Sequence, residues 1–338
     1  MILLAIIIRT DRPAELTLDC LGTVAEQVQE LGGRVVVVDN DSQDGSLETI
    51  RRGCTARGFL EPHGGPVRLI ASANNGGFAR GNNRGIRSIN AKNYLLLNSD
   101  TLVRPGSIST LFSFMDRHTD IGIAGPRLEW PDGRLQISTF RARTALGEFA
   151  RESELGLVTR LLSNHVTAMH PDSVRASPEW VSGAALFIRR EVFDKIGLLD
   201  EEFFMYFEDM EFCMRARRSG FGLAYVPMAR VVHLRGGTAT VKADASAGRR
   251  LPPYYYTARA AYHRKRAGLW GLFAANLCFT AGCAVRAVKC AVKGVRTSHA
   301  RHAWIDIWCS RGDPRGTKRS EWAYGFGSDV VLRADGAE

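Results

Sequence analysis

Two continuous apolar runs near the start of the chain have the hydrophobic pattern of strands buried on both faces. They are ILLAIII at residues 2–8 and RVVVVDN at residues 34–40. Such unbroken β-branched runs are typical of parallel sheets, whose strands are covered on both sides. Between them, apolar residues recur at the spacing typical of a helix; they are Leu16, Leu18, Leu21, Val24, Val28 and Leu31. The pattern predicts a strand, a helix and a strand joined by a right-handed crossover.

The same alternation continues to about residue 100. VRLIAS (67–72) predicts a third strand and NYLLLNSD (93–100) a fourth. Polar segments follow three of the four strands, namely DNDS, NNGGFARGNN and NSD. The order predicts a doubly wound α/β domain, in which ligands bind beyond the carboxyl ends of the strands. We therefore expect the three polar segments to converge on one rim of the sheet.

Beyond residue 105 the pattern is less regular. IGIAGPRLEW (121–130) predicts a short strand and a turn, and residues 141–178 are weakly patterned helical sequence that would suit an acceptor-side flap. The last third of the chain is basic. We divide the chain into a nucleotide-sugar-binding α/β half (1–105), an acceptor-binding and catalytic half of the same domain (106–250) and a basic helical C-terminal region (251–338).

Composition narrows the choice of partners. The 338 residues carry a formal net charge of +10, which favours acidic partners such as nucleotides, anionic lipids or nucleic acid. No helix-turn-helix, RNA-recognition or zinc-finger signature occurs, so no nucleic-acid partner is predicted. Seven cysteines without a CxxC pair indicate reduced thiols of a cytoplasmic protein. The apolar N-terminus lacks a charged leader region and predicts a core strand instead of a signal peptide.

The segment NNGGFARGNN (74–83) combines three glycines, four asparagines and one arginine. Glycine permits a close approach that a Cβ would block, and asparagine tolerates turns. The segment is either a tight turn that opens a helix or a backbone-lined seat for phosphate or sugar. Its position between the other two polar segments favours the second interpretation, with the helix N-terminus directed at an anion.

Carboxylates and one histidine form the candidate chemistry. Asp100 follows a strand, where it would either cap a helix or bind Mg²⁺ or Mn²⁺. Glu208, Asp209 and Glu211 follow the aromatic run FFMYF; they would either cap a helix or, through desolvation that raises their pKa, supply a general base. His233 follows a strand-like run and precedes a Gly-Gly turn, so it is either structural or a late ligand of the same cation.

Five segments in a fixed order carry a resemblance to a known family. They are VVVVDNDSQDGS, NNGGFARGNNRGI, LLLNSDTLV, GAALFIRREVFDKIGLLDEEFFMYFEDMEFCMRARRSG and HLRGGT. Over residues 2–265 the chain resembles family 2 glycosyltransferases of the GT-A fold, in particular their bacterial rhamnosyltransferase-like branch. It departs from them at IRTDRP, where relatives tend to have an NY or SY pair, and at Thr238, where serine is usual.

The resemblance implies a role for each matching residue. The DNDSQD segment would hold the nucleotide base and ribose, and the NNGG segment would contact the diphosphate or sugar. Because Asn98 stands at the first position of the DXD-type motif, metal binding would depend on Asp100 and His233. Asp209 would be the catalytic base, with Glu208 as the alternative. The donor-site residues implied are Thr10, Asp39, Asn40, Ser42, Asp44, Asn74, Gly76, Gly77, Arg80, Asn82, Asn98, Ser99 and Asp100, with Asn83 behind them.

The resemblance further implies an inverting, metal-dependent transfer of a sugar from a dTDP- or UDP-sugar, with dTDP-L-rhamnose as the first expectation. The acceptor would be a lipid-linked or polysaccharide glycan of the cell envelope. Two alternatives stay open: a non-catalytic nucleotide-sugar-binding scaffold, and a nucleotidyltransferase, for which the lysine-bearing glycine-rich loop after the first strand is missing. The oligomeric state is not determined, and a homo-oligomer is compatible with the sequence.

Residues 267–285 form an uncharged stretch between two basic flanks. Its nineteen residues approach the length of a membrane-spanning helix, but two glycines, Asn276 and Thr280 dilute it. A buried helix of the C-terminal region is one interpretation. An in-plane helix is favoured, since basic flanks would bind anionic headgroups. We therefore expect a peripheral protein on the cytoplasmic face of the inner membrane.

Overall fold

The four strands predicted from the apolar runs all form, and they lie side by side in one sheet. They are β1 (Ile2–Thr10), β2 (Arg34–Asp39), β3 (Val67–Ala71) and β4 (Ala91–Asn98). They are parallel in the order β3-β2-β1-β4, which confirms the doubly wound α/β prediction. This computed structural model describes residues 1–11, 13–169, 177–235, 241, 249–295, 302–309 and 330–331.

The sheet continues beyond β4 with strands from the second half of the chain. β10 (Ala185–Arg189) lies antiparallel between β4 and β6 (Ile121–Glu129), β11 (Gly222–His233) is parallel to β6, and β5 (Thr101–Val103) is antiparallel to β11. Shorter pairings are made by β7 (Leu135–Gln136) with β6, β12 (Val330–Val331) with β3, and β8 (Thr139–Phe140) with β9 (Trp180–Val181).

The prediction of a strand and a turn at residues 121–130 is confirmed, but the strand is not short. β6 is a nine-residue strand inside the sheet. Gly122, Gly125 and Pro126 interrupt its apolar run, so its period is weak. Two of these residues are there for packing, because a Cβ at Gly125 would stand 2.9 Å from the Val181 side chain and one at Gly122 would meet Phe221.

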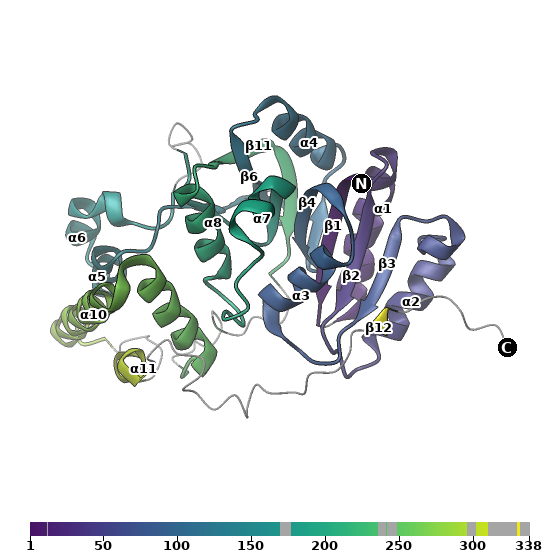
Figure 1. The fold of residues 1–338 in the computed structure, drawn as a ribbon. Helices are drawn as coiled ribbons and strands as arrows, with labels where there is room; N and C mark the ends of the chain where they lie inside the picture. Colours follow the sequence, from purple (N-terminus) through teal and green to yellow (C-terminus); the bar gives the residue numbers. More distant parts are fainter. Residues whose placement is uncertain are drawn as a thin grey trace.

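Helices cover both faces of the sheet (Figure 1). One face carries α1, α2 and α4, and the other carries α3, α7 and α8. Alternate residues of β1 supply both cores: Leu4, Ile6 and Ile8 point to the first, whereas Ala5 and Ile7 point to the second. The helix bounds are α1 Ala14–Glu30, α2 Ser46–Ala56, α3 Gly77–Arg87, α4 Ser107–Arg117, α7 Arg190–Ile196 and α8 Glu208–Arg218, with a short 3₁₀ helix at Glu61–His63.

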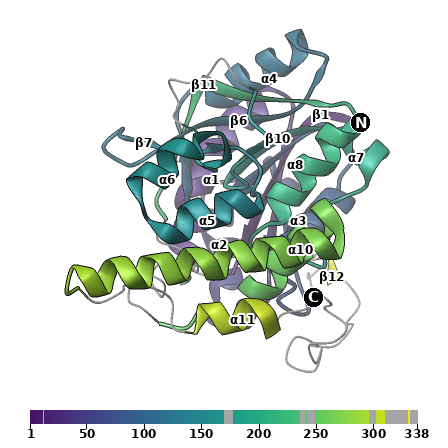
Figure 2. The ribbon, with the colours of Figure 1, turned by 90° about the vertical axis from the view of Figure 1, so that its left-hand side faces the viewer.

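A helical group lies beside the second half of the sheet, away from the N-terminal strands (Figures 1 and 2). It consists of α5 (Ala145–Ser153), α6 (Gly156–Leu161), a 3₁₀ turn (Ser163–His165), α10 (Pro253–Val292) and α11 (Ala303–Cys309). α10 breaks at Ala267 and Gly268, whose backbone angles are not helical. Its first part packs on the loop before α8, and its second part lies along α5 and α11.

Candidate active site

A pocket of about 780 Å³ lies where the carboxyl ends of the strands face the helical group. Its walls come from the end of β4, the segment between β9 and β10, the loop before α8, the end of β11, and helices α5 and α10. Predicted site residues that are distant in sequence meet here. They are Asn98, Ser99, Asp100, Glu208, Asp209 and His233.

The loop before α8 has an unusual backbone. Tyr206 and Phe207 have φ angles of +71° and +70°, in the left-handed region that costs a non-glycine residue about 1–2 kcal/mol. Phe207 is fully buried against Tyr255 and Tyr262 of α10, and this packing holds the loop in place. The strained turn directs Glu208 and Asp209, at the start of α8, into the pocket.

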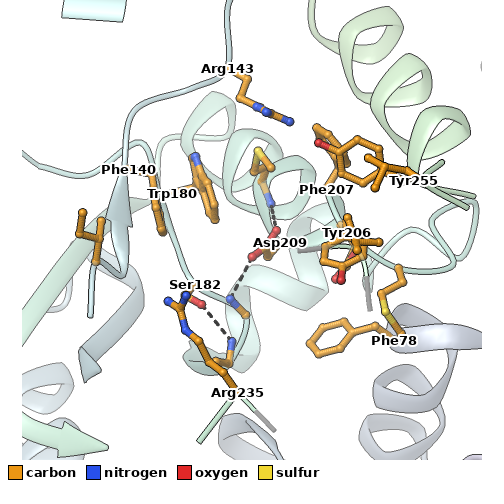
Figure 3. A pocket seen from close by; sticks show the side chains of 18 of the residues that line it. Phe78, Phe140, Arg143, Trp180, Ser182, Tyr206, Phe207, Asp209, Arg235 and Tyr255 are labelled. Atoms are coloured by element: carbon orange, nitrogen blue, oxygen red, sulfur yellow. Dashed lines mark hydrogen bonds between the residues drawn. The ribbon is translucent and has the colours of Figure 1, made fainter. Parts of the chain in front are cut away.

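Backbone amides fix the Asp209 carboxylate. The Gly183 N–H donates to Asp209 Oδ2 at 3.0 Å, and the Met210 N–H donates to Oδ1 at 2.8 Å. A Cβ at Gly183 would lie 3.2 Å from the Asp209 Cβ, so the glycine gives this carboxylate its room. Asp209 stands at the centre of the pocket view, between Trp180 and Tyr206 (Figure 3). Glu208 is buried too, and its Oε2 has no hydrogen-bond partner among the residues that the structure describes.

Burial raises the pKa of both carboxyl groups, as predicted from the aromatic run before them. The pKa of Glu208 rises to about 8, first through desolvation and then through repulsion by Asp209, with Arg9 acting in the opposite direction. Desolvation also raises the pKa of Asp209, while its bonds to the Gly183 and Met210 amides favour the charged form. At neutral pH Glu208 therefore keeps its proton. Asp209, which has amide donors, is the better base of the two.

Asp100 and His233 form a pair on the opposite wall. The antiparallel register of β5 and β11 sets His233 across from Thr101, and Asp100 Oδ1 lies 3.4 Å from His233 Nε2. No group of three or more His, Cys, Asp or Glu ligands occurs among the described residues. The pair nevertheless suits a hard divalent cation that completes its shell with water and substrate phosphates. Within the described part of the chain, His233 Nδ1 is buried without a hydrogen-bond partner, so this ring can still bind through either nitrogen or hold a water.

Two arginines near this wall were not predicted as site residues. Arg235 lines the pocket beside Asp100, is anchored by a 2.6 Å bond from its Nε to Gln136 Oε1, and lies over the Trp130 ring. Arg9 lines the pocket as well and forms a 3.0 Å ion pair with Asp11. Both lie in segments that the sequence singled out, HLRGGT and IRTDRP, but neither segment indicates which way a side chain points.

The NNGG segment has a structural role that its sequence did not reveal. Gly77 has a φ of +77°, and a Cβ there would stand 1.9 Å from the carbonyl oxygen of Phe204. The next residue, Phe78, donates its N–H to the same carbonyl at 2.7 Å and lines the pocket. The segment thus docks on the loop that carries Glu208 and Asp209.

Asparagines tie this segment to the rest of the sheet rim. Asn40 Nδ2 donates to Asn75 Oδ1 at 2.7 Å. Within α3, Asn82 bonds the Phe78 carbonyl, and Asn83 bonds both the carbonyl and the N–H of Leu199. These bonds are internal to the fold and give these asparagines a structural role of their own.

The remaining predicted donor residues lie along the rim outside the 780 Å³ pocket. Thr10 is buried and accepts a hydrogen bond from Thr17, and the Asp44 carboxylate accepts from the Ser46 N–H at the start of α2. Asp39 is buried at the end of β2; its Oδ2 accepts from the Ser42 N–H, while its Oδ1 has no hydrogen-bond partner. Donor contacts stay a prediction for Thr10, Asp39, Asn40, Ser42, Asp44, Asn74, Gly76, Gly77, Arg80 and Asn82.

The wall beyond Asp209 is aromatic and cationic. Phe140 and Trp180 stack with ring centroids 3.9 Å apart, and Trp180 Nε1 donates to the Arg141 carbonyl, which fixes the ring. Arg143 lies 5.0 Å from the centroid of the Phe207 ring, above Asp209 in Figure 3. The sequence does not indicate that these residues line a site. Arg143 lies in a weakly patterned segment, and the pattern around Trp180 indicates only the start of a strand.

The family model described as "Glycosyltransferase like family 2" matches residues 16–250. Among curated proteins, the chain is 28% identical over 218 residues to a low-salt glycan biosynthesis hexosyltransferase of Haloferax volcanii, covering 62% of this chain and 63% of that one. It is also 28% identical over 213 residues to the N-acetylglucosaminyl-diphospho-decaprenol L-rhamnosyltransferase of Mycobacterium tuberculosis, covering 59% and 66%. The matches thus span just under two thirds of these relatives.

Solved structures show the same fold at low sequence identity. A mannosyltransferase of Pyrobaculum calidifontis, in complex with GDP-Man and Mn²⁺, aligns with a TM-score of 0.53 at 14% identity over 87% of this chain and 76% of that one. The TarS protein of S. aureus in complex with UDP-GlcNAc aligns with a TM-score of 0.54, at 14% identity over 90% and 79%.

Proposed function

The chain belongs to glycosyltransferase family 2 and has the GT-A fold, and from this premise we propose that it is an inverting glycosyltransferase. The single observation that carries the proposal is Asp209, held by two backbone amides in a pocket that the Asp100–His233 pair also lines. Sugar transfer from a nucleoside diphosphate sugar can use a base for the acceptor hydroxyl and a cation for the departing diphosphate.

In the proposed reaction an acceptor hydroxyl attacks the anomeric carbon of the donor sugar. Its proton passes to Asp209, a carbon–oxygen bond forms, and the bond from the anomeric carbon to the phosphate oxygen breaks. The nucleoside diphosphate leaves with the electron pair, and the configuration inverts. Protonated Glu208, next to the base, holds a hydrogen-bond donor at the pocket surface at neutral pH.

Asp100 and His233 would hold a divalent cation, Mg²⁺ or Mn²⁺, which when bound offsets charge on the departing diphosphate. Arg235 and Arg9 line the pocket and bring fixed positive charge toward the same anion. The asparagines and backbone of the NNGG segment, with Arg80, form the rim that we assign to the donor.

We propose a dTDP- or UDP-sugar as donor, with dTDP-L-rhamnose first. The names of two relatives support this choice. One is the Mycobacterium protein, and the other is a dTDP-rhamnosyl transferase of Shigella flexneri, which is 27% identical to this chain over about half of each chain. The acceptor would be a lipid-linked or polysaccharide glycan in cell-surface glycan synthesis, and the diphospho-decaprenol in the first of these names favours the lipid-linked option.

An outward-facing apolar stripe on α10 supports peripheral attachment to the cytoplasmic face of the membrane. Pro253–Lys293 is long and apolar enough to cross a membrane, and 28% of its most apolar window is buried. Past the break the exposed residues repeat with helical period; they are Leu269, Trp270, Phe273, Leu277, Val288 and Val292. Phe273 contacts Trp308, so the two helices α10 and α11 share this surface.

The inward side of the same helix mixes apolar and polar residues, because Leu272 and Phe279 are buried there beside Asn276 and Arg286. A surface helix in water carries polar residues on its outer side, which this stripe does not. A helix with its apolar side outward and lysines near its end suits the plane of an anionic membrane surface, where tryptophans are favoured. We therefore infer an in-plane helix, as the sequence predicted.

Donor turnover with the purified chain tests the function. Asp209→Asn should leave dTDP-induced thermal stabilisation intact and reduce sugar transfer by at least about a hundredfold, the lower end of the range for a general base. Asp100→Ala should lose the metal-dependent part of that stabilisation. Unimpaired transfer by both variants would refute the roles. Donor binding without turnover in the wild type would instead indicate a scaffold.

A further inference from the structure

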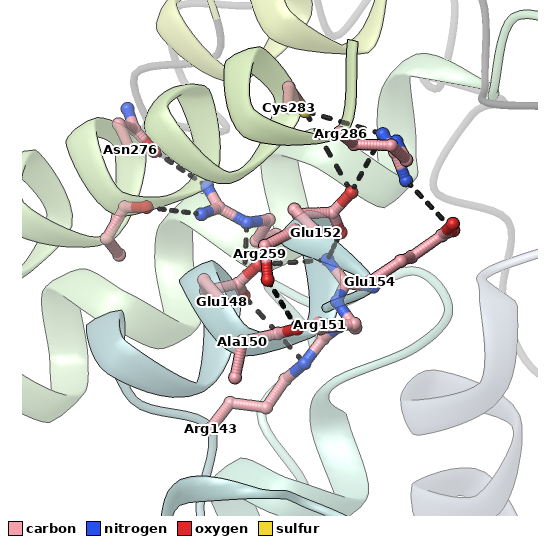
Figure 4. Close-up of polar contacts among 12 residues, drawn as sticks. Arg143, Glu148, Ala150, Arg151, Glu152, Glu154, Arg259, Asn276, Cys283 and Arg286 are labelled. Atoms are coloured by element: carbon pink, nitrogen blue, oxygen red, sulfur yellow. Dashed lines mark hydrogen bonds and ion pairs between the residues drawn. The ribbon is translucent and has the colours of Figure 1, made fainter. Parts of the chain in front are cut away.

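Behind the aromatic wall lies a cluster of charged side chains, most of them buried, that the proposed chemistry does not use (Figure 4). Arg143, Arg151 and Arg259 share the Glu148 carboxylate at 3.8, 2.9 and 3.4 Å. Arg286 pairs with Glu152 and Glu154. Among the residues that the structure describes, four guanidinium groups thus face three carboxylates, which leaves this cluster one positive charge in excess.

The cluster also affects the pKa values of two neighbouring side chains, Tyr255 and His263. Burial would raise the pKa of Tyr255, but attraction to Arg143 and Arg151 outweighs it and lowers that pKa. Burial lowers the pKa of His263 although Glu148 accepts its hydrogen bond, so this ring is neutral at pH 7 and adds no charge. The phenol of Tyr255 lies next to the two arginines that border the pocket.

Arg143 is the member best placed to use the excess charge. Its ion pair with Glu148 is the longest of the three, and the same carboxylate is taken by Arg151 and Arg259 at shorter distance. Arg143 and Arg151 line the pocket, with 12% and 42% of their side chains exposed. A buried guanidinium with an incomplete counter-charge is costly unless an anion completes it. A phosphate oxygen matches its fork of donors.

The position of Arg143 separates this charge from the donor's diphosphate. Arg143 lies on one side of Asp209 and Arg235 on the other (Figure 3). Arg235 is the cation next to Asp100, where the donor diphosphate is assigned. The anion at Arg143 therefore lies on the acceptor's side of the base.

The lining between and beyond these points fits the rest of such an acceptor. The stacked Trp180 ring stands between Arg143 and Asp209 in the view, where a flat aromatic face can carry a sugar ring. Past Arg143 the pocket continues to Tyr256, Phe279 and Ala303 on the inner sides of α10 and α11. The outer sides of these two helices bear the apolar surface assigned to the membrane.

We propose that Arg143, supported by Arg151, binds the diphosphate of a lipid-linked acceptor, whose sugar rests on Trp180 and whose chain leads to α10 and α11. This assignment rests on the proposed function and makes it narrower, because a polysaccharide acceptor without phosphate has no use for the site. Arg143 is a specificity-determining residue here, and it takes no part in bond making.

Calorimetric titration of farnesyl diphosphate, below its micellar concentration, tests the site directly. The protein is first saturated with dTDP and Mg²⁺, so the donor's diphosphate site is occupied. Arg143→Ala should weaken farnesyl diphosphate binding about tenfold or more, as expected for loss of charge-assisted hydrogen bonds. Arg143→Lys, which keeps the charge but not the fork, should fall between. Arg217→Gln on α8, an arginine paired with Glu179 outside the pocket, is the control and should bind like wild type.

Farnesol separates phosphate recognition from chain recognition, and its affinity should be the same in wild type and Arg143→Ala. Equal farnesyl diphosphate affinity in these two proteins would overturn the proposal. So would an equal loss for farnesol and farnesyl diphosphate. Thermal melting checks that each variant is folded. If Arg143→Ala does not fold, the comparison of Arg143→Lys with the wild type decides the test. Failure of dTDP to bind at the first step would count against the proposed donor and not against the Arg143 site.

Discussion

The two walls of the pocket are built in different ways. The donor-side wall, with Asn98, Asp100 and His233, consists of short polar side chains at strand ends, and the sheet fixes their spacing through strand register. The acceptor-side wall, with Arg143 and Trp180, consists of large side chains from separate segments that hold one another by stacking and ion pairs. The first wall needs the sheet alone, whereas the second also needs α5 and α10.

The difference indicates where changes in this enzyme would be tolerated. Substitutions on the donor-side wall should alter chemistry with little effect on packing. Substitutions on the acceptor-side wall should alter acceptor affinity and, where they reach Phe207 or Tyr255, the strained loop that carries the base. The segment that carries Gly77 docks on the loop that carries Asp209 where Gly77 touches Phe204, and this contact joins the sheet rim to that loop.

The largest effect is expected at that contact. Gly77→Ala places a Cβ 1.9 Å from the Phe204 carbonyl oxygen and should lower the free energy of unfolding by roughly 3 kcal/mol or more, with loss of transfer. Gly106→Ala is the matched control, because Gly106 has a similar φ of +75° but open space at its Cβ; it should lose about 1 kcal/mol. Denaturant titrations measure both variants. If both lost the same free energy of unfolding, the sheet rim and the loop before α8 would not be joined through this contact.

The next largest effect is expected on membrane binding by α10, the helix that also supports the acceptor-side wall. Trp270→Ser combined with Phe273→Ser should weaken binding to anionic vesicles on the order of a hundredfold, from about 1.5–3 kcal/mol per buried aromatic side chain. Transfer to a water-soluble acceptor should stay unchanged. Leu3→Ser with Met228→Ser removes two exposed apolar side chains from the sheet and is the control. Sedimentation with vesicles measures both, and similar losses in the two double variants would contradict an oriented membrane surface.

A smaller effect is expected on the acceptor KM, which should change without the donor KM and so distinguish the two walls. Trp180→Leu keeps an apolar side chain over Phe140 but removes the flat ring, so the acceptor KM should rise about tenfold, equivalent to about 1.4 kcal/mol. The donor KM should not change, because we assign the donor to the wall of Asp100 and His233. Initial-rate kinetics with each substrate varied in turn decide this. A rise in the donor KM of the same size would remove the distinction between the walls.

The smallest effect concerns the protonation of Glu208. Because its pKa in the folded protein is about 8, against 4.5 as reference, the unfolded chain loses this proton first as the pH rises. The wild type should therefore lose stability between about pH 5 and pH 8. Glu208→Gln, which cannot ionise, should be more stable than the wild type at pH 8 by on the order of 1 kcal/mol, with a smaller advantage at pH 5. Melting curves at both pH values test this; an advantage that shrinks as the pH rises would contradict the assignment.

By itself the sequence determined the parallel half of the sheet, the family, and the residues of the donor-side wall. Unbroken apolar runs and polar segments after strands are local patterns, and strand ends converge in any doubly wound sheet. The raised pKa of Glu208 and Asp209 was also predictable, because the aromatic residues that bury them are their neighbours in the chain.

Tertiary structure alone decided the acceptor-side wall and the packing of the NNGG segment. Besides the donor contact predicted for it, Gly77 closely approaches the Phe204 carbonyl, 127 positions further along the chain. Arg143 and Arg259 meet at Glu148 only because α10 returns to lie along α5. No local period records such contacts, since they depend on where distant segments pack, and an arginine in a weakly patterned stretch looks the same whether it faces water or a pocket.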